Sequence, residues 1–227
     1  SLVNILLVAL RFPETLKCAA KARISLLTGL VNLKKAFQYK SLRIVFLVSF
    51  LLAIGFNFFT QFFQVLLVDK FSFSQSEIGD FFAYMGLWIA ITQGIILRPM
   101  SMKFKPAQIL KFSMILLAAT FPFLLLPDKA FYIYLIIPFV AIFQGMTQPN
   151  TTTLVSNMAG DDEQGEILGV NQSIQSAAQA IPAIIAGYVT AVNINLPTLF
   201  AAGTTFVAWL VFRFIFLRKK KLEAVMQ

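Results

Sequence analysis

The stretch 42-LRIVFLVSFLLAIGFNFFTQFFQVLLV-68 decides the fold class of this chain. Its one charged residue is Arg43, at its beginning. The hydrocarbon core of a bilayer is crossed by roughly 20 apolar helical residues, so this segment is long enough to span it. The sequence therefore predicts a transmembrane helix here.

Five more segments have the same length and character. They cover residues 77–97, 107–126, 131–151, 165–189 and 196–217. The whole chain is 58% hydrophobic with 25 phenylalanines, and its mean hydropathy of +0.78 exceeds that of soluble proteins. The sequence thus predicts an all-α membrane protein, a six-transmembrane-helix bundle in which the excess apolar surface faces lipid.

Basic residues indicate how the bundle is oriented. Residues 11–43 hold eight Lys or Arg, residues 98–111 hold four and residues 218–221 hold four, whereas the opposite loops hold only Lys70 and Lys129. Cytoplasmic loops are enriched in Lys and Arg, and an even number of spans puts all three basic regions on one side. We therefore expect a multi-pass protein of the cell (inner or plasma) membrane with both termini in the cytoplasm. The net charge of +9 does not indicate a nucleic-acid partner, because the basic residues lie in loops between apolar runs.

The same pattern predicts four domains. Residues 1–10 are too short to span a bilayer and resemble the end of a truncated transmembrane helix, and residues 11–41 form a cytoplasmic basic linker. The linker contains an amphipathic helix that either anchors to the membrane surface or bridges two transmembrane domains. Residues 42–217 form the transmembrane domain, and residues 218–227 form a cytoplasmic tail.

Composition argues against most catalytic chemistry. The chain has no histidine, and its single cysteine is Cys18. This excludes imidazole acid–base catalysis, histidine-dependent triads and the usual zinc ligand sets. No metal or cofactor is expected, and a membrane-embedded enzyme is the least favoured function.

Two internal repeats indicate inverted symmetry. Gly79-Asp80 precedes Gln93 by fourteen residues, and Gly165-Glu166 precedes Gln179 by the same interval. A weaker repeat pairs residues 53–61 with residues 141–148. Because the paired segments enter the membrane from opposite sides, they predict two inverted three-helix repeats, an arrangement found in secondary transporters.

Polar residues are concentrated in the first, fourth and fifth segments, on one face of each helix, while the third and sixth segments are nearly bare. Either these stripes line a polar cavity for a solute, or they hold the helices together by hydrogen bonds worth ~0.6 kcal/mol per pair. We favour the cavity, because polar residues are concentrated in three helices and are scarce in two others. The candidate residues of the substrate path are Asn57, Gln61, Gln64, Gln144, Gln148, Gln172, Gln175 and Gln179.

Charged residues lie near the ends of the predicted helices, and no carboxylate reaches the middle of the membrane. A proton-driven transporter needs such a group as its proton carrier. If the protein is proton-coupled, the carrier lies outside these 227 residues.

Four groups of residues occur in a specific order along the chain. They are Phe12-Pro13-Glu14-Thr15-Leu16; Ser74 to Gly79; Gln93-Gly94 with Arg98-Pro99-Met100 and Lys103-Phe104; and Gly145, Pro149, Ser156, Gln164-Gly165, Gly169, Pro182 and Gly187. In this order they resemble the carboxy-terminal half of a major facilitator superfamily transporter, more narrowly its drug and tetracycline efflux branch.

The resemblance implies secondary active transport of a small organic solute by alternating access, with proton coupling and drug-type efflux. It implies a missing amino-terminal six-helix half as partner, beside the lipid bilayer, the small-molecule substrate and protons. It also implies that Gly94, Arg98 and Lys103 form a cytoplasmic loop latch. Arg98 and Lys103 would equally serve only to fix the membrane topology. The alternative function is a non-transporting membrane scaffold or assembly subunit.

Overall fold

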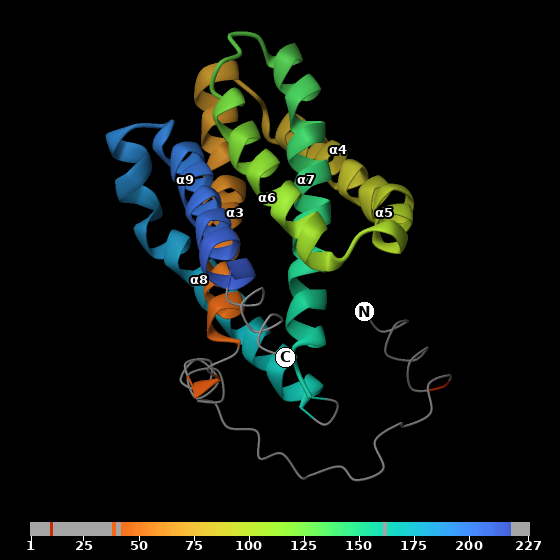
Figure 1. Ribbon diagram of the computed structural model, residues 1–227. Helices are drawn as coiled ribbons and strands as arrows, with labels where there is room; N and C mark the ends of the chain where they lie inside the picture. The colour runs from red at the N-terminus through yellow and green to blue at the C-terminus, as the bar shows by residue number, and fades with distance from the viewer. Residues whose placement is uncertain (1–9, 11–37, 40–41, 161–162, 219–227) are drawn as a thin grey trace.

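The computed structural model of the chain describes residues 10, 38–39, 42–160 and 163–218 (Figure 1). The truncated helix predicted for residues 1–10, the linker predicted for residues 11–41 and the tail predicted for residues 218–227 lie almost entirely outside the described residues.

All six predicted spans are helices. In chain order the described elements are α3 (Arg43–Phe71), α4 (Gln75–Ile91), η1 (Thr92–Ile96), α5 (Leu97–Lys103), α6 (Pro106–Phe123), α7 (Ala130–Asn157), α8 (Gln164–Val192), α9 (Leu196–Leu210) and η2 (Val211–Phe216). The π-helical turns η1 and η2 each lie within a longer helix, so α4, η1 and α5 form one span and α9 and η2 form another.

Local signals explain where the helices begin. Ser74 accepts a hydrogen bond from the Glu77 backbone N–H, and Glu77 accepts one from the Ser74 backbone N–H, which forms the capping box at the start of α4. Pro106 and Pro197 stand in the first turns of α6 and α9, where the missing N–H costs nothing.

Five of these spans are both long and apolar enough to cross a membrane, namely Arg43–Phe71, Gln75–Lys103, Pro106–Phe123, Ala130–Asn157 and Leu196–Phe216. α8 is not one of them although it has 29 residues. Its length suffices for a bilayer, but its row of glutamines lowers its hydropathy. α8 packs against α3, α7 and α9, and of its glutamines Gln172 and Gln179 are exposed.

The packing of the helices follows the inverted repeat. One repeat comprises α3, the α4–η1–α5 span and α6, and the other comprises α7, α8 and the α9–η2 span. α3 packs mainly against α8 and α9, whereas α7 packs mainly against α4 and α6, and α6 packs against α9. The first helix of each repeat thus contacts the second and third helices of the other. This exchange is the pattern expected of two units related by a pseudo-twofold axis.

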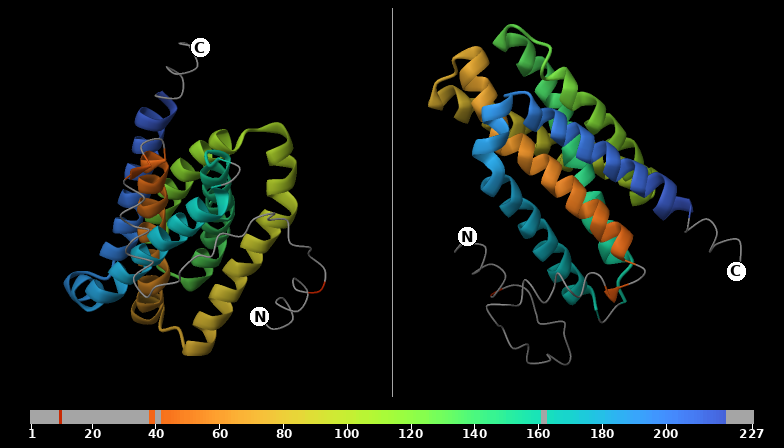
Figure 2. Two further views of the ribbon diagram at one scale, coloured as in Figure 1. Left: turned by 90° about the horizontal axis from the view of Figure 1, so that it is seen from below. Right: turned by 90° about the vertical axis from the view of Figure 1, so that its left-hand side faces the viewer.

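Two apolar clusters lie at opposite ends of the bundle. One joins the beginning of α3 to the ends of α7 and η2, with Val45, Leu154 and Phe212 buried in it. The other is rich in phenylalanine and includes Phe59 and Phe121, whose rings lie 5.1 Å apart. Between these clusters the interior is partly polar, because Gln144 and Thr147 of α7 are buried there. A smaller apolar cluster of Ile54, Phe58, Phe62 and Ala178 lies beside them between α3 and α8. The connections α3–α4, α6–α7 and α8–α9 all lie toward one end of the bundle (Figures 1 and 2).

Candidate functional site

The polar interior contains a cavity of about 270 Å³ between α3, the α4–η1 span, α7 and α8. These helices are the first and second of each repeat. The cavity is lined by Ala53, Phe56, Asn57, Ile89, Gln93, Gln144, Gln148, Gln175 and Gln179. Gln93, Gln148 and Gln179 are exposed, so the cavity opens onto one face of the bundle. Six carboxamides and three apolar side chains therefore surround a space large enough for a small organic molecule.

The cavity includes five of the eight residues predicted for the substrate path: Asn57, Gln144, Gln148, Gln175 and Gln179. The other three, Gln61, Gln64 and Gln172, lie on the same helices but do not line it. Gln64 donates a hydrogen bond to the carbonyl of Gln61 at 3.0 Å, and Gln172 is exposed.

Gln93 lines the cavity but was not among the predicted path residues. It lies in the π turn η1, where an additional residue per turn changes the direction in which side chains point. The signal that could have identified it is the repeat itself, because Gln93 and Gln179 occupy equivalent positions and both reach the cavity.

A close helix contact holds η1 against α7. Thr92 is fully buried, and a Cβ atom added at Gly145 would lie 3.1 Å from both the Cβ and Cγ2 atoms of Thr92. Only glycine at position 145 permits this separation without displacement. The contact brings Gln93 and Gln144 to the same cavity.

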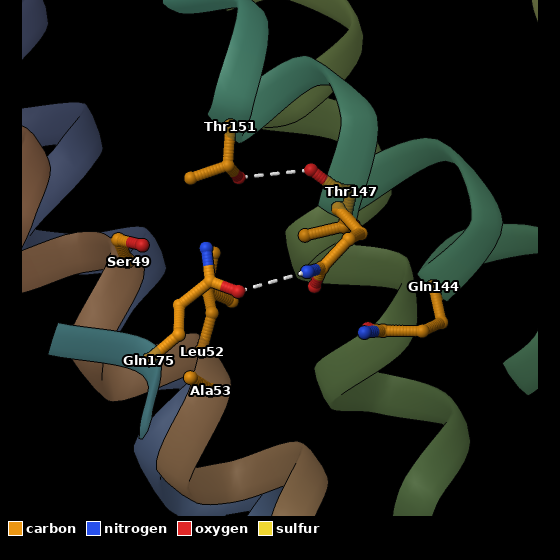
Figure 3. Close-up of a pocket in the computed structure, with 8 residues that line it drawn as sticks. Ser49, Leu52, Ala53, Gln144, Thr147, Thr151 and Gln175 are labelled. Carbon is orange, nitrogen blue, oxygen red and sulfur yellow. Dashed lines mark hydrogen bonds between the residues drawn. The ribbon is translucent and has the colours of Figure 1, made fainter. Parts of the chain in front are cut away.

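A second, smaller pocket adjoins the cavity (Figure 3). Its volume of about 10 Å³ corresponds to roughly one water molecule. The two spaces share Ala53, Gln144, Gln148 and Gln175. Gln148 Nε2 donates to Gln175 Oε1 at 3.2 Å, which joins α7 to α8 at the boundary between the two spaces.

Other polar residues near the pocket connect helices. Ser49 Oγ donates to Asn171 Oδ1 at 2.8 Å, and both side chains are buried between α3 and α8. Thr147 Oγ1 lies 2.9 Å from Ser113 Oγ and connects α7 to α6. The polar residues of these helices thus have two roles, since some cross-link the bundle and some line the cavity.

Gln144 differs from the other buried polar residues of its helix. It is 7% exposed and lines both spaces, and its side chain forms no hydrogen bond with another described residue. Because no fully buried side-chain nitrogen or oxygen in the described part of the chain lacks a partner, its carboxamide atoms are accessible from these spaces. Thr147, Asn150 and Thr151 on the same helix all hydrogen-bond to protein atoms. The Gln144 carboxamide is therefore available to a molecule in the cavity.

No charged side chain lines either space in the described part of the chain. The residues predicted as a loop latch lie elsewhere: Gly94 is exposed on η1, and Arg98 and Lys103 are exposed on α5. Within the described ranges no three His, Cys, Asp or Glu side chains are grouped so that they could hold a metal ion. The cavity can thus offer hydrogen bonds and apolar contact.

A membrane bundle of two inverted three-helix repeats with an uncharged polar cavity at mid-depth is the architecture of a secondary transporter. The sequence matches the Major Facilitator Superfamily over residues 45–225, and the chain belongs to that family. Membership confirms the predicted family and the multi-pass membrane class. The resemblance to the carboxy-terminal half of such a transporter is consistent with the six described spans.

The sequence is also similar to Multidrug resistance protein 1 of Bacillus subtilis (strain 168). The two are 28% identical over 163 residues, which cover 71% of this chain and 41% of that relative. The matched part of this chain therefore corresponds to less than half of the relative's length.

Proposed function

We propose that this chain forms the carboxy-terminal half of a secondary active transporter that moves a small organic solute by alternating access. The observation that carries the proposal is the carboxamide-lined cavity between the first two helices of both repeats. Its open face, at Gln93, Gln148 and Gln179, is the place where an amino-terminal six-helix half would complete a central binding site.

The proposed solute is amphipathic, and the proposed transport is drug-type efflux across the cell membrane with both termini in the cytoplasm. Phe56 and Ile89 supply apolar contact, and the carboxamides supply donors and acceptors. The similarity to a protein named for multidrug resistance supports the same solute class.

The proposed energy source is a proton gradient. Because no carboxylate lines the cavity among the described residues, the proton carrier is assigned to the amino-terminal half. The solute site and the proton site would then lie on opposite sides of one cavity.

The latch proposal is that Gly94, Arg98 and Lys103 stabilise the state closed toward the cytoplasm. Arg98 and Lys103 are exposed on one short helix next to η1, where acidic or helix-terminal groups of the other half could reach them. Replacing both with Gln should lower the transport rate at unchanged protein level. Transport at the original rate would leave the two residues with a topological role only.

The test of the proposed function is transport by the full-length protein in liposomes with an imposed pH gradient. Amphipathic aromatic solutes should accumulate only when the gradient is present, and Gln93→Leu or Gln179→Leu should reduce the rate. Asn157→Leu is the matched control, because Asn157 is an exposed amide at the end of α7, away from the cavity. If no solute class moves and the gradient does not decay, the scaffold alternative replaces the transporter.

A further inference from the structure

We propose that Gln144 determines the specificity of the cavity and selects solutes that carry an uncharged donor–acceptor group such as a primary carboxamide. This inference rests on the proposed function and adds to it a chemical class of substrate. It is carried by the burial of Gln144, by its lack of a partner and by its position between the two spaces.

Burial makes the Gln144 carboxamide selective. Gln144 is only 7% exposed and lines the cavity, so a solute that fills the cavity displaces the water at its carboxamide, and leaving the carboxamide without a hydrogen bond then costs free energy. A solute that satisfies the group is favoured over one that occupies the same volume without doing so. An exposed residue such as Gln179 lacks this property, because water can replace the solute's hydrogen bonds.

The neighbours of Gln144 leave its hydrogen-bonding groups free. Ala53 and Leu52 offer apolar surface, and the nearby amides of Gln148 and Gln175 are joined to each other. Figure 3 shows the Gln144 side chain extending from α7 into the space bordered by Ala53 and Gln175. The solute group that reaches this space therefore meets one acceptor oxygen and one NH₂ donor held side by side.

The chemistry of the matching group follows from this pair. A primary carboxamide offers the complementary donor and acceptor and can form two hydrogen bonds with another carboxamide. A charged group is disfavoured, because no opposite charge lines the described cavity to offset its desolvation. The remainder of the solute would pack against Phe56 and Ile89, so an aromatic carboxamide fits both parts of the site.

The experiment compares 2-naphthamide with methyl 2-naphthoate, two probes of similar size in which the ester keeps the carbonyl and lacks the N–H donors. Binding of both is measured to the full-length protein in nanodiscs, for the original sequence, Gln144→Leu and Gln144→Met. Asn157→Leu on the same helix is the control. The original protein should bind the amide about 5- to 100-fold more tightly than the ester. Both Gln144 variants should reduce this ratio toward one, because they remove two hydrogen bonds from the amide and only one, to the carbonyl, from the ester.

Ester binding that falls by no more than the loss of one hydrogen bond also shows that the variant is folded, so a loss of preference cannot be attributed to misfolding. If Gln144→Leu binds neither probe, the amide-to-ester ratio is taken from Gln144→Met, which keeps an unbranched side chain. An equal amide-to-ester ratio in the original protein and in the folded variant overturns the inference, and so does failure of the original protein to bind the amide. Transport of other amphipathic solutes would in that case leave the proposed function standing.

Discussion

At the scale of single residues, close packing of this bundle depends on glycine. A Cβ atom added to Gly55 of α3 would lie 3.2 Å from the carbonyl oxygen of Ala201 in α9, and it would also contact the Thr204 hydroxyl. In membranes, where lipid tails are as apolar as leucine, small residues allow the backbone contact that holds helices together. Gly55 therefore sets the distance between α3 and α9.

Replacing Gly55 with Ala should destabilise the protein by about 1–3 kcal/mol, because the methyl group meets a backbone carbonyl that cannot rotate away. The measurement is the free energy of unfolding in mixed micelles titrated with SDS. Gly86→Ala is the control, since a Cβ atom there meets nothing within 4 Å. Alanine is the better helix former, so this control should be neutral or stabilising by up to about 1 kcal/mol. Equal effects of the two substitutions would contradict the packing role.

The residue scale also shows which parts of the site could be predicted from the sequence. The capping box of Ser74 and Glu77 was predictable because both partners lie within one turn. The cavity residues of α7 and α8 were predictable because those helices keep a regular period. The helical period does not identify Gln93, because the π turn at η1 interrupts that period, and only its equivalence with Gln179 in the repeat indicates it. The side-chain bond that leaves Gln144 alone, between Gln148 and Gln175, depends on the tertiary packing of two helices and has no local signal.

At the scale of helices, α8 is held to α3 by a polar contact inside an otherwise apolar interface. The Ser49–Asn171 hydrogen bond joins residues 122 positions apart in sequence, and both are 3% exposed. A second side-chain hydrogen bond, between Gln148 and Gln175, joins α8 to α7. α8 is thus attached to both neighbours by side-chain hydrogen bonds.

The Ser49–Asn171 bond should appear as a coupling between the two positions. Ser49→Ala and Asn171→Ala should each destabilise the protein, and a double-mutant cycle should give a coupling free energy of about 0.6–1.7 kcal/mol. Unfolding in SDS-titrated micelles provides the measurement. Thr120→Ala combined with Asn171→Ala is the control cycle and should show none, because Thr120 bonds only to Leu116 in its own helix. Strict additivity of Ser49→Ala and Asn171→Ala would show that the bond does not form.

The arrangement of helices was predictable in part. Six spans followed from hydropathy and length, and the inverted repeat followed from the shared spacing of Gln93 and Gln179. The pairing of α3 with α8 and α9 could not be predicted from the sequence. It joins helices that are far apart in the chain, and it depends on the complementary shapes of their surfaces rather than on any repeated residue. α8 is not among the helices apolar enough to count as spans by hydropathy, and it is held in the bundle by contacts with α3, α7 and α9 while Gln172 and Gln179 stay exposed.

At the scale of the whole molecule, the proposed orientation in the membrane rests on charge and helix number. The α6–α7 and α8–α9 connections lie toward the same end of the bundle (Figure 2). The α5–α6 connection lies in the basic stretch 98–111, which the positive-inside rule assigns to the cytoplasm. Because α6 and α7 separate the two connections, this proposal puts the α7–α8 connection in the cytoplasm as well.

Four single-cysteine variants test this orientation in a Cys18→Ser background, which removes the one native cysteine. Asp128→Cys and Asn193→Cys lie in the α6–α7 and α8–α9 connections, and Lys105→Cys and Gly160→Cys lie in the α5–α6 and α7–α8 connections. All four positions are exposed. A membrane-impermeant maleimide added to intact cells should label the first pair and not the second, because the reagent reaches only the outer face. Permeabilised cells should label all four, which shows that each thiol is reactive. Labelling of Lys105→Cys in intact cells would invert the topology and, with it, the side of the membrane on which Arg98 and Lys103 could act as a latch.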